Sequence, residues 1–275
     1  MTLAQILVLE GDTRQEILKG ILKKNKYELI TPKDINDIKE NNLKPIIIFA
    51  PVLGTNNGMI SINSKEYEFE EFMTCLNKNS RIIIGRLKPE EKKLVEHIGI
   101  EYMELLENNE FAILNSIPTA EGAIKMAIEK TEITLHGSNC LVTGFGIVAK
   151  TLARMLSGIG ATVYIAARNK KDLTRAFESR YNCLPIKCLR NNIGDMDYIF
   201  NTVPSIIFTR DVLKEALKST FFIELASLPG GFDKEFIKEQ GLTLNNAPGL
   251  PGKVAPKSAA EYIYLTSKNF IERIE

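Results

Sequence analysis

Residues 141–150 read Leu-Val-Thr-Gly-Phe-Gly-Ile-Val-Ala-Lys, an apolar run followed by two closely spaced glycines and the start of a helical pattern. In Gly-x-Gly-x-x-Ala motifs, a strand, a tight turn and a helix in this order bind the pyrophosphate of a dinucleotide. Gly144 would permit the tight turn, Gly146 would let phosphate oxygens approach the backbone, and Ala149 would let the helix pack against the strand. The N–H groups at the helix start would face the pyrophosphate. The stretch therefore predicts a dinucleotide site, with a purely structural glycine turn as the alternative.

The residues after the next predicted strand, 162–167, indicate which dinucleotide binds. NAD-preferring sites carry Asp or Glu here, because a carboxylate bonds the ribose 2′-hydroxyl. This chain has Arg-Asn-Lys-Lys at 168–171, and Arg168 lies 24 residues after Gly144 (168 − 144 = 24). A guanidinium can hold a 2′-phosphate through two parallel hydrogen bonds, and neighbouring lysines add positive charge. The sequence therefore predicts NADP rather than NAD; the alternative is a solvated basic loop.

Length and composition exclude several classes of protein. The chain has 275 residues. This length exceeds the usual size of a domain with a single hydrophobic core, so we expect two domains. A formal net charge of +1 provides no basic field for nucleic acid. The four cysteines form no Cys-x-x-Cys pair and there are only two histidines, so we expect no metal site and reduced, mostly buried thiols in a cytoplasmic protein. We expect neither a signal peptide nor a membrane span, since no basic region precedes a long apolar core and no apolar run approaches ~18 residues.

Short apolar runs alternate with amphipathic stretches along the chain, a pattern typical of parallel sheets covered by helices. In the first part we expect strands at 5–9, 27–30, 45–50, 81–85 and 100–103, helices at 13–24 and 88–97, and a loop or hairpin at 51–65. A further helix is expected from Ile117 to about Glu129, with Pro118 in its first turn. In the second part we expect strands at 139–143, 162–167, 183–186, 198–202, 221–226 and 243–245, and a last helix at 255–272.

This alternation predicts an α/β fold of two doubly wound, Rossmann-like domains with parallel sheets and a cleft between them. Residues 1–118 would form an N-terminal substrate domain and residues 119–254 the NADP-binding domain, with the terminal helix, about 255–275, packing back on the first domain. Ligands of such sheets bind beyond the carboxyl ends of the strands. We therefore expect ligand-binding residues in the loops 11–15, 115–122, 201–205, 226–233 and 246–258. For any single loop the alternative is that Gly and Pro only form a turn.

Several of these loops contain longer motifs. They read Asn-Ser-Ile-Pro-Thr-x-Glu-Gly at 115–122, Leu-His-Gly-Ser at 135–138, Gly-x-Gly at 144–146, Ala-Ser-x-Pro-Gly-Gly at 226–231, and Ala-Pro-Gly-Leu-Pro-Gly-x-Val-Ala-Pro-Lys at 247–257. Through these motifs the chain resembles the dipicolinate synthase A family over essentially its whole length. It departs from the family pattern at Glu10, where glycine is expected, at Glu224, where aspartate is usual, and at 147–149, where a polar or glycine-containing sequence is more frequent.

The resemblance implies NADP-dependent oxidation of dihydrodipicolinate to dipicolinate (pyridine-2,6-dicarboxylate) during sporulation, in the cytoplasm of the mother cell. It also implies dipicolinate synthase B, the flavoprotein-like second component of the enzyme, as partner, and it leaves open whether the chain forms a homo-oligomer. Two alternatives remain: another two-domain NAD(P)-dependent oxidoreductase, and a non-catalytic nucleotide-binding subunit of such a complex. Hydroxyacid dehydrogenases need a paired His and carboxylate in the nucleotide domain, which His97 and His136 do not provide.

A dicarboxylate substrate requires cationic, hydroxyl and N–H partners. The substrate-binding candidates are Thr13, Arg14, Ser116, Thr119, Ser205, Ser227, Val254, Ala255 and Lys257. The cofactor-binding candidates are Gly144, Gly146, Ile147, Val148, Arg168, Asn169, Lys170, Thr202, Val203, Pro204, Ala226 and Ser227. The candidates for proton transfer are Lys257, Glu121 and His136. Three alternatives stay open: a capping or hinge role for His136, a lysine-holding role for Glu121, and pairing of Arg14 with Asp12 or Asp34.

Overall fold

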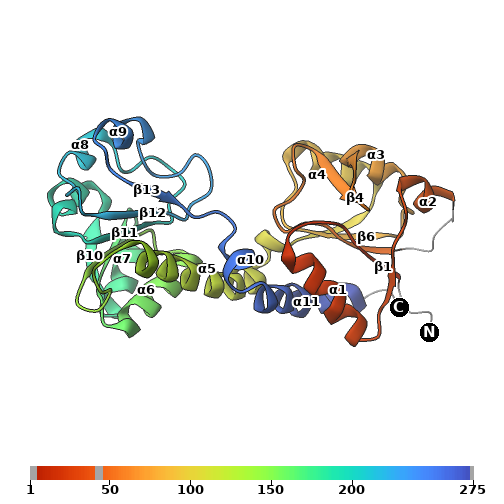
Figure 1. The fold of residues 1–275 in the computed structure, drawn as a ribbon, viewed down its shortest axis with the longest axis horizontal. Helices are drawn as coiled ribbons and strands as arrows, with labels where there is room; N and C mark the ends of the chain where they lie inside the picture. The colour runs from red at the N-terminus through yellow and green to blue at the C-terminus, as the bar shows by residue number, and fades with distance from the viewer. Residues whose placement is uncertain (1–4, 41–45, 273–275) are drawn as a thin grey trace. The chain divides into compact units, whose positions relative to one another are not determined.

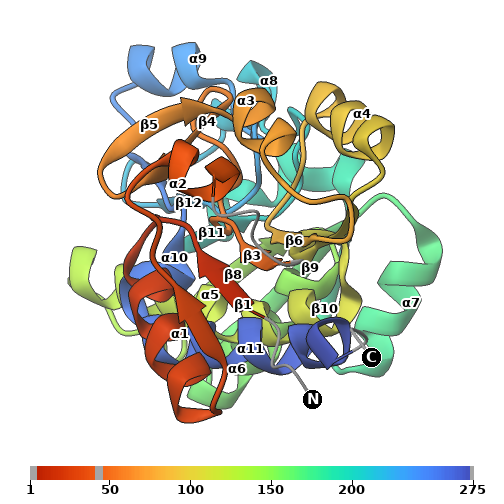
Figure 2. The same ribbon diagram turned by 90° about the vertical axis from the view of Figure 1, so that its right-hand side faces the viewer.

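The computed structural model describes residues 5–40 and 46–272 (Figures 1 and 2). Two predictions fall on residues outside this description. They are the expected absence of a signal peptide, at Met1–Ala4, and the first residue of the predicted strand 45–50, Pro45. The chain divides into two compact units, one of Met1–Asn115 with Pro251–Glu275, and one of Ser116–Leu250. Each unit is described by itself below.

The first unit is built on a parallel sheet with the strand order β2-β1-β3-β6-β7. The strands of this sheet are β1 (Gln5–Val8), β2 (Glu28–Ile30), β3 (Ile46–Phe49), β6 (Arg81–Ile84) and β7 (Glu101–Glu104). An antiparallel hairpin, β4 (Met59–Ile62) and β5 (Lys65–Glu68), begins within the predicted loop or hairpin segment 51–65 and extends three residues beyond it. The other elements between the strands are α1 (Thr13–Lys24), α2 (Ile35–Glu40), α3 (Phe69–Thr74), α4 (Pro89–Ile98) and the 3-10 turn η1 (Leu105–Glu107).

Both faces of this sheet are covered, which explains why β3 and β6 read as uninterrupted apolar runs. On one face, Ile48 packs in a core cluster with side chains of α2, α3 and α4. On the other face, Ile47 shares a cluster with Leu18 of α1 and Ile263 of α11 (Pro256–Glu272). The last helix therefore belongs to the core of the first unit, and it lies beside α1 in both views (Figures 1 and 2).

The second unit contains a parallel sheet with the strand order β10-β9-β8-β11-β12-β13. Its strands are β8 (Asn139–Thr143), β9 (Thr162–Ala167), β10 (Asn182–Pro185), β11 (Tyr198–Asn201), β12 (Phe221–Glu224) and β13 (Leu244–Asn246). The helical elements are α5 (Asn109–Lys130), which begins in the first unit, α6 (Ile147–Ile159), α7 (Lys170–Glu178), η2 (Ile186–Asn191), η3 (Ile193–Asp195), α8 (Arg210–Leu213), α9 (Lys234–Glu239) and α10 (Leu250–Val254).

Numbered within the unit, the strand order is 3-2-1-4-5-6, the arrangement of dinucleotide-binding Rossmann domains. Leu152 and Leu156 of α6 are fully buried in the core cluster that also contains Val142 of β8. The predicted α/β fold with parallel, doubly wound sheets is confirmed.

The helix before β8 differs from the prediction. The predicted start at Ile117 is wrong, because α5 begins at Asn109 and contains Pro118 in its interior. Pro118 has no N–H to donate to the carbonyl four residues earlier, so the helix lacks one backbone hydrogen bond at that point. The true start signal is Asn108, whose side chain accepts a hydrogen bond from the N–H of Phe111 at 2.9 Å.

The expectation of mostly buried thiols is also wrong. Cys140 is buried, Cys75 and Cys188 are half-buried, and Cys183 is exposed. Burial within β8, with a smaller contribution from the Asp197 charge, raises the pKa of Cys140 to about 12, so that thiol stays protonated at neutral pH.

Within residues 5–40 and 46–272, no helix is both long and apolar enough to cross a membrane.

Candidate functional site

The glycine turn follows β8, which has β9 on one side and β11 on the other. Ligands of doubly wound sheets bind at this point, where successive connections leave in opposite directions. Gly144 has a φ of +82°, and an added side-chain carbon would lie 2.9 Å from Thr202 Oγ1 and 3.2 Å from Val203 Cγ2. The positive φ and the close contacts both require glycine, so Gly144 shapes the turn.

Gly146 has a different role, because its backbone is one that any residue adopts. Its φ is −79° and its ψ is −167°, and an added side-chain carbon would meet no atom within 4 Å. The first turn of α6, with Ile147 and Val148, starts directly after it and has no side-chain cap. Uncapped N–H groups at the positive end of a helix beside open space suit an anion. The pyrophosphate of a dinucleotide therefore fits this turn.

The apolar members of the motif hold the turn in place. Phe145 is 6% exposed and packs edge-on against Tyr181 with ring centroids 6.3 Å apart. Ala149 is fully buried in the same core cluster. Side chains directed into the core on both sides of Gly146 leave the glycine backbone at the surface.

Basic side chains follow β9, the neighbour of β8. Arg168 and Lys170, both predicted to bind the cofactor, are exposed, as is Lys171. The side chain of Asn169, also a predicted cofactor ligand, accepts the N–H of Lys171 at 2.8 Å and caps α7. Arg168 and the two lysines thus form the accessible cationic group at this end of the turn.

A row of buried polar side chains, which the sequence does not predict, connects three strand ends. Thr143, Asn201 and Glu224 are the last residues of β8, β11 and β12, and they stand opposite one another in the parallel register. Their side chains are 0%, 0% and 6% exposed. The hydroxyl of Thr143 donates to Asn201 Oδ1 at 2.5 Å, and Asn201 Nδ2 donates to Glu224 Oε1 at 2.6 Å. We call these three residues the strand-end network.

The strand-end network binds the backbone of the loops that follow β11 and β12. Asn201 Oδ1 accepts the N–H of Val203 at 3.2 Å, and Asn201 Nδ2 donates to the Val203 carbonyl at 2.9 Å. Glu224 accepts the N–H of Ala226 at 3.0 Å and of Gly231 at 2.7 Å. The signal in the sequence is position, since Thr143 ends a predicted strand, Asn201 lies one residue before the end of its strand, and Glu224 lies two residues before the end of its strand.

The predicted residues in these loops differ in exposure. Pro204, Ser205 and Ser227 are exposed, and Val203 and Ala226 are half-buried. The hydroxyl of Thr202, a predicted cofactor ligand, donates to the Thr143 carbonyl at 2.6 Å. The loops therefore present small side chains and a proline at the carboxyl edge of the sheet, next to Gly144.

In the first unit, the loop after β1 is organised by an ion pair between buried Arg14 and half-buried Asp12. Arg14, a predicted substrate ligand, is 2% exposed, and its Nε donates to Asp12 Oδ1 at 2.9 Å. Asp12 also accepts the backbone N–H of Arg14 at 3.0 Å and is the N-cap of α1. The alternative of Arg14 pairing with Asp12 is thus observed. Any added side chain on Gly252 would lie 2.8 Å from Asp12 Oδ2, so α10 closes over the pair.

The Asp12–Arg14 pair predicts a pH-dependent contribution to stability. Burial raises the pKa of Asp12, but the hydrogen bonds and charge of Arg14 outweigh burial and lower it overall. A carboxyl group with a lowered pKa stabilises the fold above its unfolded pKa, and this stabilisation is lost as the pH falls through the folded pKa. Asp12→Asn should therefore lower the free energy of unfolding by about 2 kcal/mol at pH 7, because a buried guanidinium loses its charged partner. The difference from wild type should shrink below about pH 4.

Urea unfolding at pH 7 and at pH 3–4 measures this difference, with Glu66→Gln as the control, since Glu66 is an exposed residue of β5. A difference between wild type and Asp12→Asn that stays constant over this pH range would contradict the assignment.

Glu10, which departs from the family pattern, has a local role. Its carboxylate oxygens each accept the N–H of Ser64 at 3.0 Å, and Ser64 has a φ of +63° in the turn of the β4–β5 hairpin. Glu10 therefore ties the loop after β1 to the hairpin.

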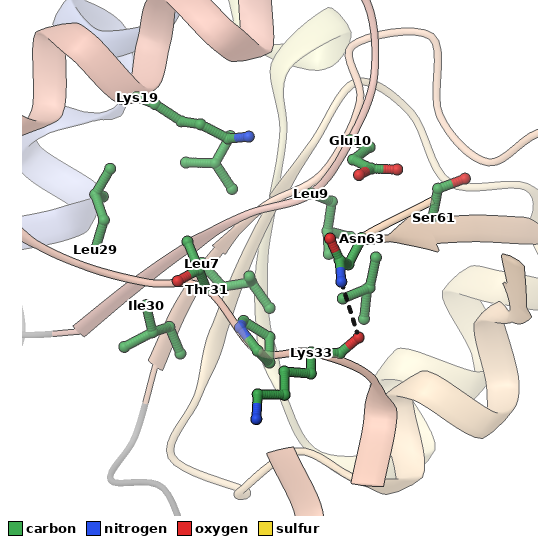
Figure 3. A pocket seen from close by; sticks show the side chains of 13 residues that line it. Leu7, Leu9, Glu10, Lys19, Leu29, Ile30, Thr31, Lys33, Ser61 and Asn63 are labelled. Carbon is green, nitrogen blue, oxygen red and sulfur yellow. Dashed lines mark hydrogen bonds between the residues drawn. The ribbon is translucent and has the colours of Figure 1, made fainter. Parts of the chain in front are cut away.

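A cavity of about 300 Å³ lies beyond the carboxyl ends of β1 and β2. Figure 3 shows Lys19 of α1 on one side and Glu10, Ser61 and Asn63 on another. Asn63 Nδ2 donates to the Lys33 carbonyl at 3.4 Å. Thr13 and Arg14 do not line this cavity, so it is distinct from the predicted substrate residues of the first unit.

The remaining predicted residues lie on helices. In α5, Ser116 is buried and its hydroxyl lies 2.7 Å from Thr151 Oγ1, while Thr119 is half-buried and Glu121 is exposed. Lys257 is exposed in the first turn of α11, and Val254, the last residue of α10, is half-buried. The N–H of Ala255 donates to the Pro251 carbonyl at 3.2 Å. The N–H of Ala255 is therefore engaged within the chain in this structure, where α10 leads into α11.

His136 lies at the amino end of β8, the edge of the sheet opposite Gly144. Its Nδ1 is 3.0 Å from the carbonyl of Ile159 at the end of α6, and its ring occupies the space beside Gly160, where a side-chain carbon would overlap it. This geometry favours the capping role, because it ties the end of α6 to the start of β8.

Comparison with known proteins places this geometry in a family. No family model matches the chain. Dipicolinate synthase A of Bacillus subtilis (strain 168) is 40% identical over 161 residues, 58% of this chain and 54% of that protein, so this match spans about half of the relative's length. The solved structure of the dipicolinate synthase A chain from Bacillus subtilis has a TM-score of 0.88 and 30% identity, covering 100% of this chain and 99% of that chain.

A second solved structure, dipicolinate synthase A from Bacillus halodurans, has a TM-score of 0.89 and 29% identity over 98% of both chains. The D-lactate dehydrogenase of Escherichia coli shares the fold, with a TM-score of 0.63 over 98% of this chain and 96% of that chain, at 12% identity. Sequence and fold agree over the full length of the two dipicolinate synthase A structures, and this chain belongs to the dipicolinate synthase A family.

Proposed function

We propose that this chain binds NADP(H) at the turn around Gly146 and, as the A component of a dipicolinate synthase, oxidises dihydrodipicolinate to dipicolinate. The observation that carries the proposal is the open space beside Gly146, at the uncapped start of α6 and at the carboxyl edge of the sheet. The fold does not require glycine there, whereas a bound pyrophosphate does.

The preference for NADP over NAD is supported by Arg168 and Lys170. Both side chains are exposed directly after β9, at the position where an acidic residue would bond a ribose 2′-hydroxyl. A guanidinium and an ammonium group attract a 2′-phosphate and offer it hydrogen bonds.

The bound coenzyme would accept the hydride, which leaves orientation and one proton to the chain. The net reaction converts dihydrodipicolinate and NADP⁺ into dipicolinate, NADPH and one proton, so the aromatic ring forms as the hydride leaves. Val203, Pro204, Ala226 and Ser227, in the loops after β11 and β12, would orient the nicotinamide ring, because holding it close to the donor carbon of the substrate lowers the barrier.

Two exposed residues are proposed for the proton and the carboxylates. Lys257 would bind a substrate carboxylate or take the proton, and Glu121 is the second candidate for the proton. The hydroxyls of Thr13, Thr119, Ser205 and Ser227 and the N–H of Val254 are the other proposed substrate contacts. Ser116 is 1% exposed and would act indirectly, through its contact with Thr151. Arg14 would act through its pair with Asp12, which shapes the loop carrying Thr13.

We further propose that the chain works with dipicolinate synthase B, a flavoprotein-like partner, in the mother-cell cytoplasm of a sporulating bacterium. The relatives are named as one subunit of a synthase, which supports a partner chain. If the chemistry resides in that partner, this chain would serve as its nucleotide-binding subunit; if the substrate differs, it would be another two-domain NAD(P)-dependent oxidoreductase.

A reconstituted assay separates these functions. Freshly generated dihydrodipicolinate and NADP⁺ are supplied to this chain, to the flavoprotein-like partner, and to both, while NADPH absorbance and dipicolinate are followed. The proposal expects both products whenever this chain is present, with more when the partner is added. Product from the partner alone, or none from any mixture, would contradict it.

A further inference from the structure

We propose that the strand-end network of Thr143, Asn201 and Glu224 positions the two loops, 202–205 and 226–231, that would flank the nicotinamide. The inference rests on the proposed coenzyme site. It goes further by assigning an indirect role to three residues that are too buried to present polar groups to a ligand. They are positioning residues, since they act through the backbone of the loops.

The amide of Asn201 is fully satisfied. Its two N–H groups donate to the Val203 carbonyl at 2.9 Å and to Glu224 Oε1 at 2.6 Å. Its oxygen accepts from the Thr143 hydroxyl at 2.5 Å and from the Val203 N–H at 3.2 Å. An amide has two donors and two acceptor positions, so none is left over. Asn201 therefore holds the peptide groups on both sides of Val203 and fixes the direction of the chain as it leaves β11.

Glu224 sets the direction of these bonds. A carboxylate only accepts, so it requires the Asn201 nitrogen to face it, and the Asn201 oxygen then faces Thr143. The Thr143 hydroxyl must donate to that oxygen, which leaves a lone pair for the Thr202 N–H at 3.3 Å. The orientation thus passes from β12 across β11 to β8, the strand that leads into the glycine turn.

The loop after β12 is held by the same carboxylate. Glu224 accepts the N–H of Ala226 at 3.0 Å and of Gly231 at 2.7 Å, which joins both ends of the loop. Gly230 and Gly231 have no room for a side chain, because an added carbon on Gly230 would lie 2.7 Å from Glu224 Oε2, and one on Gly231 would overlap the Asn201 amide. The glycines in Ala-Ser-x-Pro-Gly-Gly are therefore needed to bring the backbone onto the network.

Glu224→Gln tests the inference, because glutamine has the same shape and a donor in place of one acceptor. Whichever way its amide turns, its NH₂ faces a donor: the Gly231 N–H, or Asn201 Nδ2 and the Ala226 N–H. Amide hydrogen exchange of the ligand-free protein should speed up by about 10-fold or more at Ala226 and Gly231, since a lost buried hydrogen bond loosens the local structure. The control Glu239→Gln alters an exposed carboxylate of α9 that pairs with Arg210 and should leave those amides unchanged.

Two ligands separate loop positioning from general damage. 2′,5′-ADP carries the adenosine part of NADPH with its 2′- and 5′-phosphates but no nicotinamide, so it reports on Arg168 and the glycine turn and not on the two loops that would flank the nicotinamide. In Glu224→Gln the Kd for 2′,5′-ADP should stay within about 2-fold of wild type, while NADPH binds about 10-fold more weakly. Thr143→Val removes one hydroxyl and keeps the side-chain volume. It should also weaken NADPH binding more than 2′,5′-ADP binding, by a smaller factor than Glu224→Gln.

Each outcome decides between the two proposals. Wild-type exchange rates and NADPH affinity in both folded variants would overturn the positioning role. Equal weakening of 2′,5′-ADP and NADPH would also overturn it, because it indicates a general loss of structure. If the wild type binds neither ligand, the proposed function fails, yet exchange at Val203, Ala226 and Gly231 still tests the network. If Glu224→Gln does not fold, Thr143→Val decides.

Discussion

Replacing Gly146 by valine is expected to weaken NADPH binding by at least about 100-fold while the protein remains folded. The folded chain tolerates the side chain, because the φ of −79° suits any residue and no atom lies within 4 Å of an added carbon. A bound pyrophosphate would occupy the same space, and losing its backbone contacts corresponds to about 2.7 kcal/mol for a 100-fold change. Valine is a poorer N-cap than glycine, so we expect a loss of stability of no more than about 1 kcal/mol.

Titration calorimetry with NADPH and thermal unfolding, run in parallel, measure the two effects. Gly158→Ala is the matched control, because Gly158 also has open space beside it near the other end of α6. Gly144→Ala should behave in the opposite way, since its φ of +82° and the contact with Thr202 make the substitution costly to the fold itself. Normal NADPH affinity in folded Gly146→Val would show that no pyrophosphate lies on this turn.

Replacing Arg168 by glutamate is expected to reverse the coenzyme preference. The substitution removes a guanidinium and adds a carboxylate at the end of β9, so NADPH should bind about 100-fold more weakly through lost charge-assisted hydrogen bonds and new repulsion. NADH lacks the 2′-phosphate, and its affinity should stay the same or rise, because a carboxylate can bond the ribose hydroxyls. Arg168 is exposed, so the thermal midpoint should not change.

Binding of both coenzymes to wild type, Arg168→Glu and the control Arg154→Glu measures the preference. Arg154 is an exposed residue of α6, and the control makes the same charge change away from the strand end. The wild-type preference should also weaken at high salt, because exposed charges are screened. Equal losses for NADPH and NADH, or no loss for either, would remove Arg168 from the 2′-phosphate site.

The sequence predicts the β8–turn–α6 unit well, because each part has its own local signal. The strand Asn139–Thr143 contains the apolar run Cys140–Val142, Gly144 and Gly146 mark the turn, and α6 has an apolar face with Leu152 and Leu156 buried. The predicted and observed bounds of β8 and β9 agree for the same reason. Periodicity and glycine placement are local properties, and they do not depend on which strands become neighbours.

Other features depend on contacts that a single sequence does not display. Pro118 suggests a helix start by local rules, but Asn108 caps the helix and α5 begins earlier in the chain, at Asn109. Asn201 and Glu224 read as polar residues at the ends of strands, and only the order β8-β11-β12 brings them side by side. From the sequence alone, Arg14 is a candidate cation for binding the substrate. Its burial and its hydrogen bonds to Asp12 become visible only in the fold.

The central claim is that a phosphorylated nicotinamide dinucleotide binds across residues 144–149. Titration calorimetry of the wild-type chain with NADP⁺ and with NAD⁺, each with and without the proposed flavoprotein-like partner, tests it directly. The account predicts a heat of association with NADP⁺ and a Kd about 10-fold or more below that for NAD⁺. Absence of heat with both coenzymes in every mixture would contradict it.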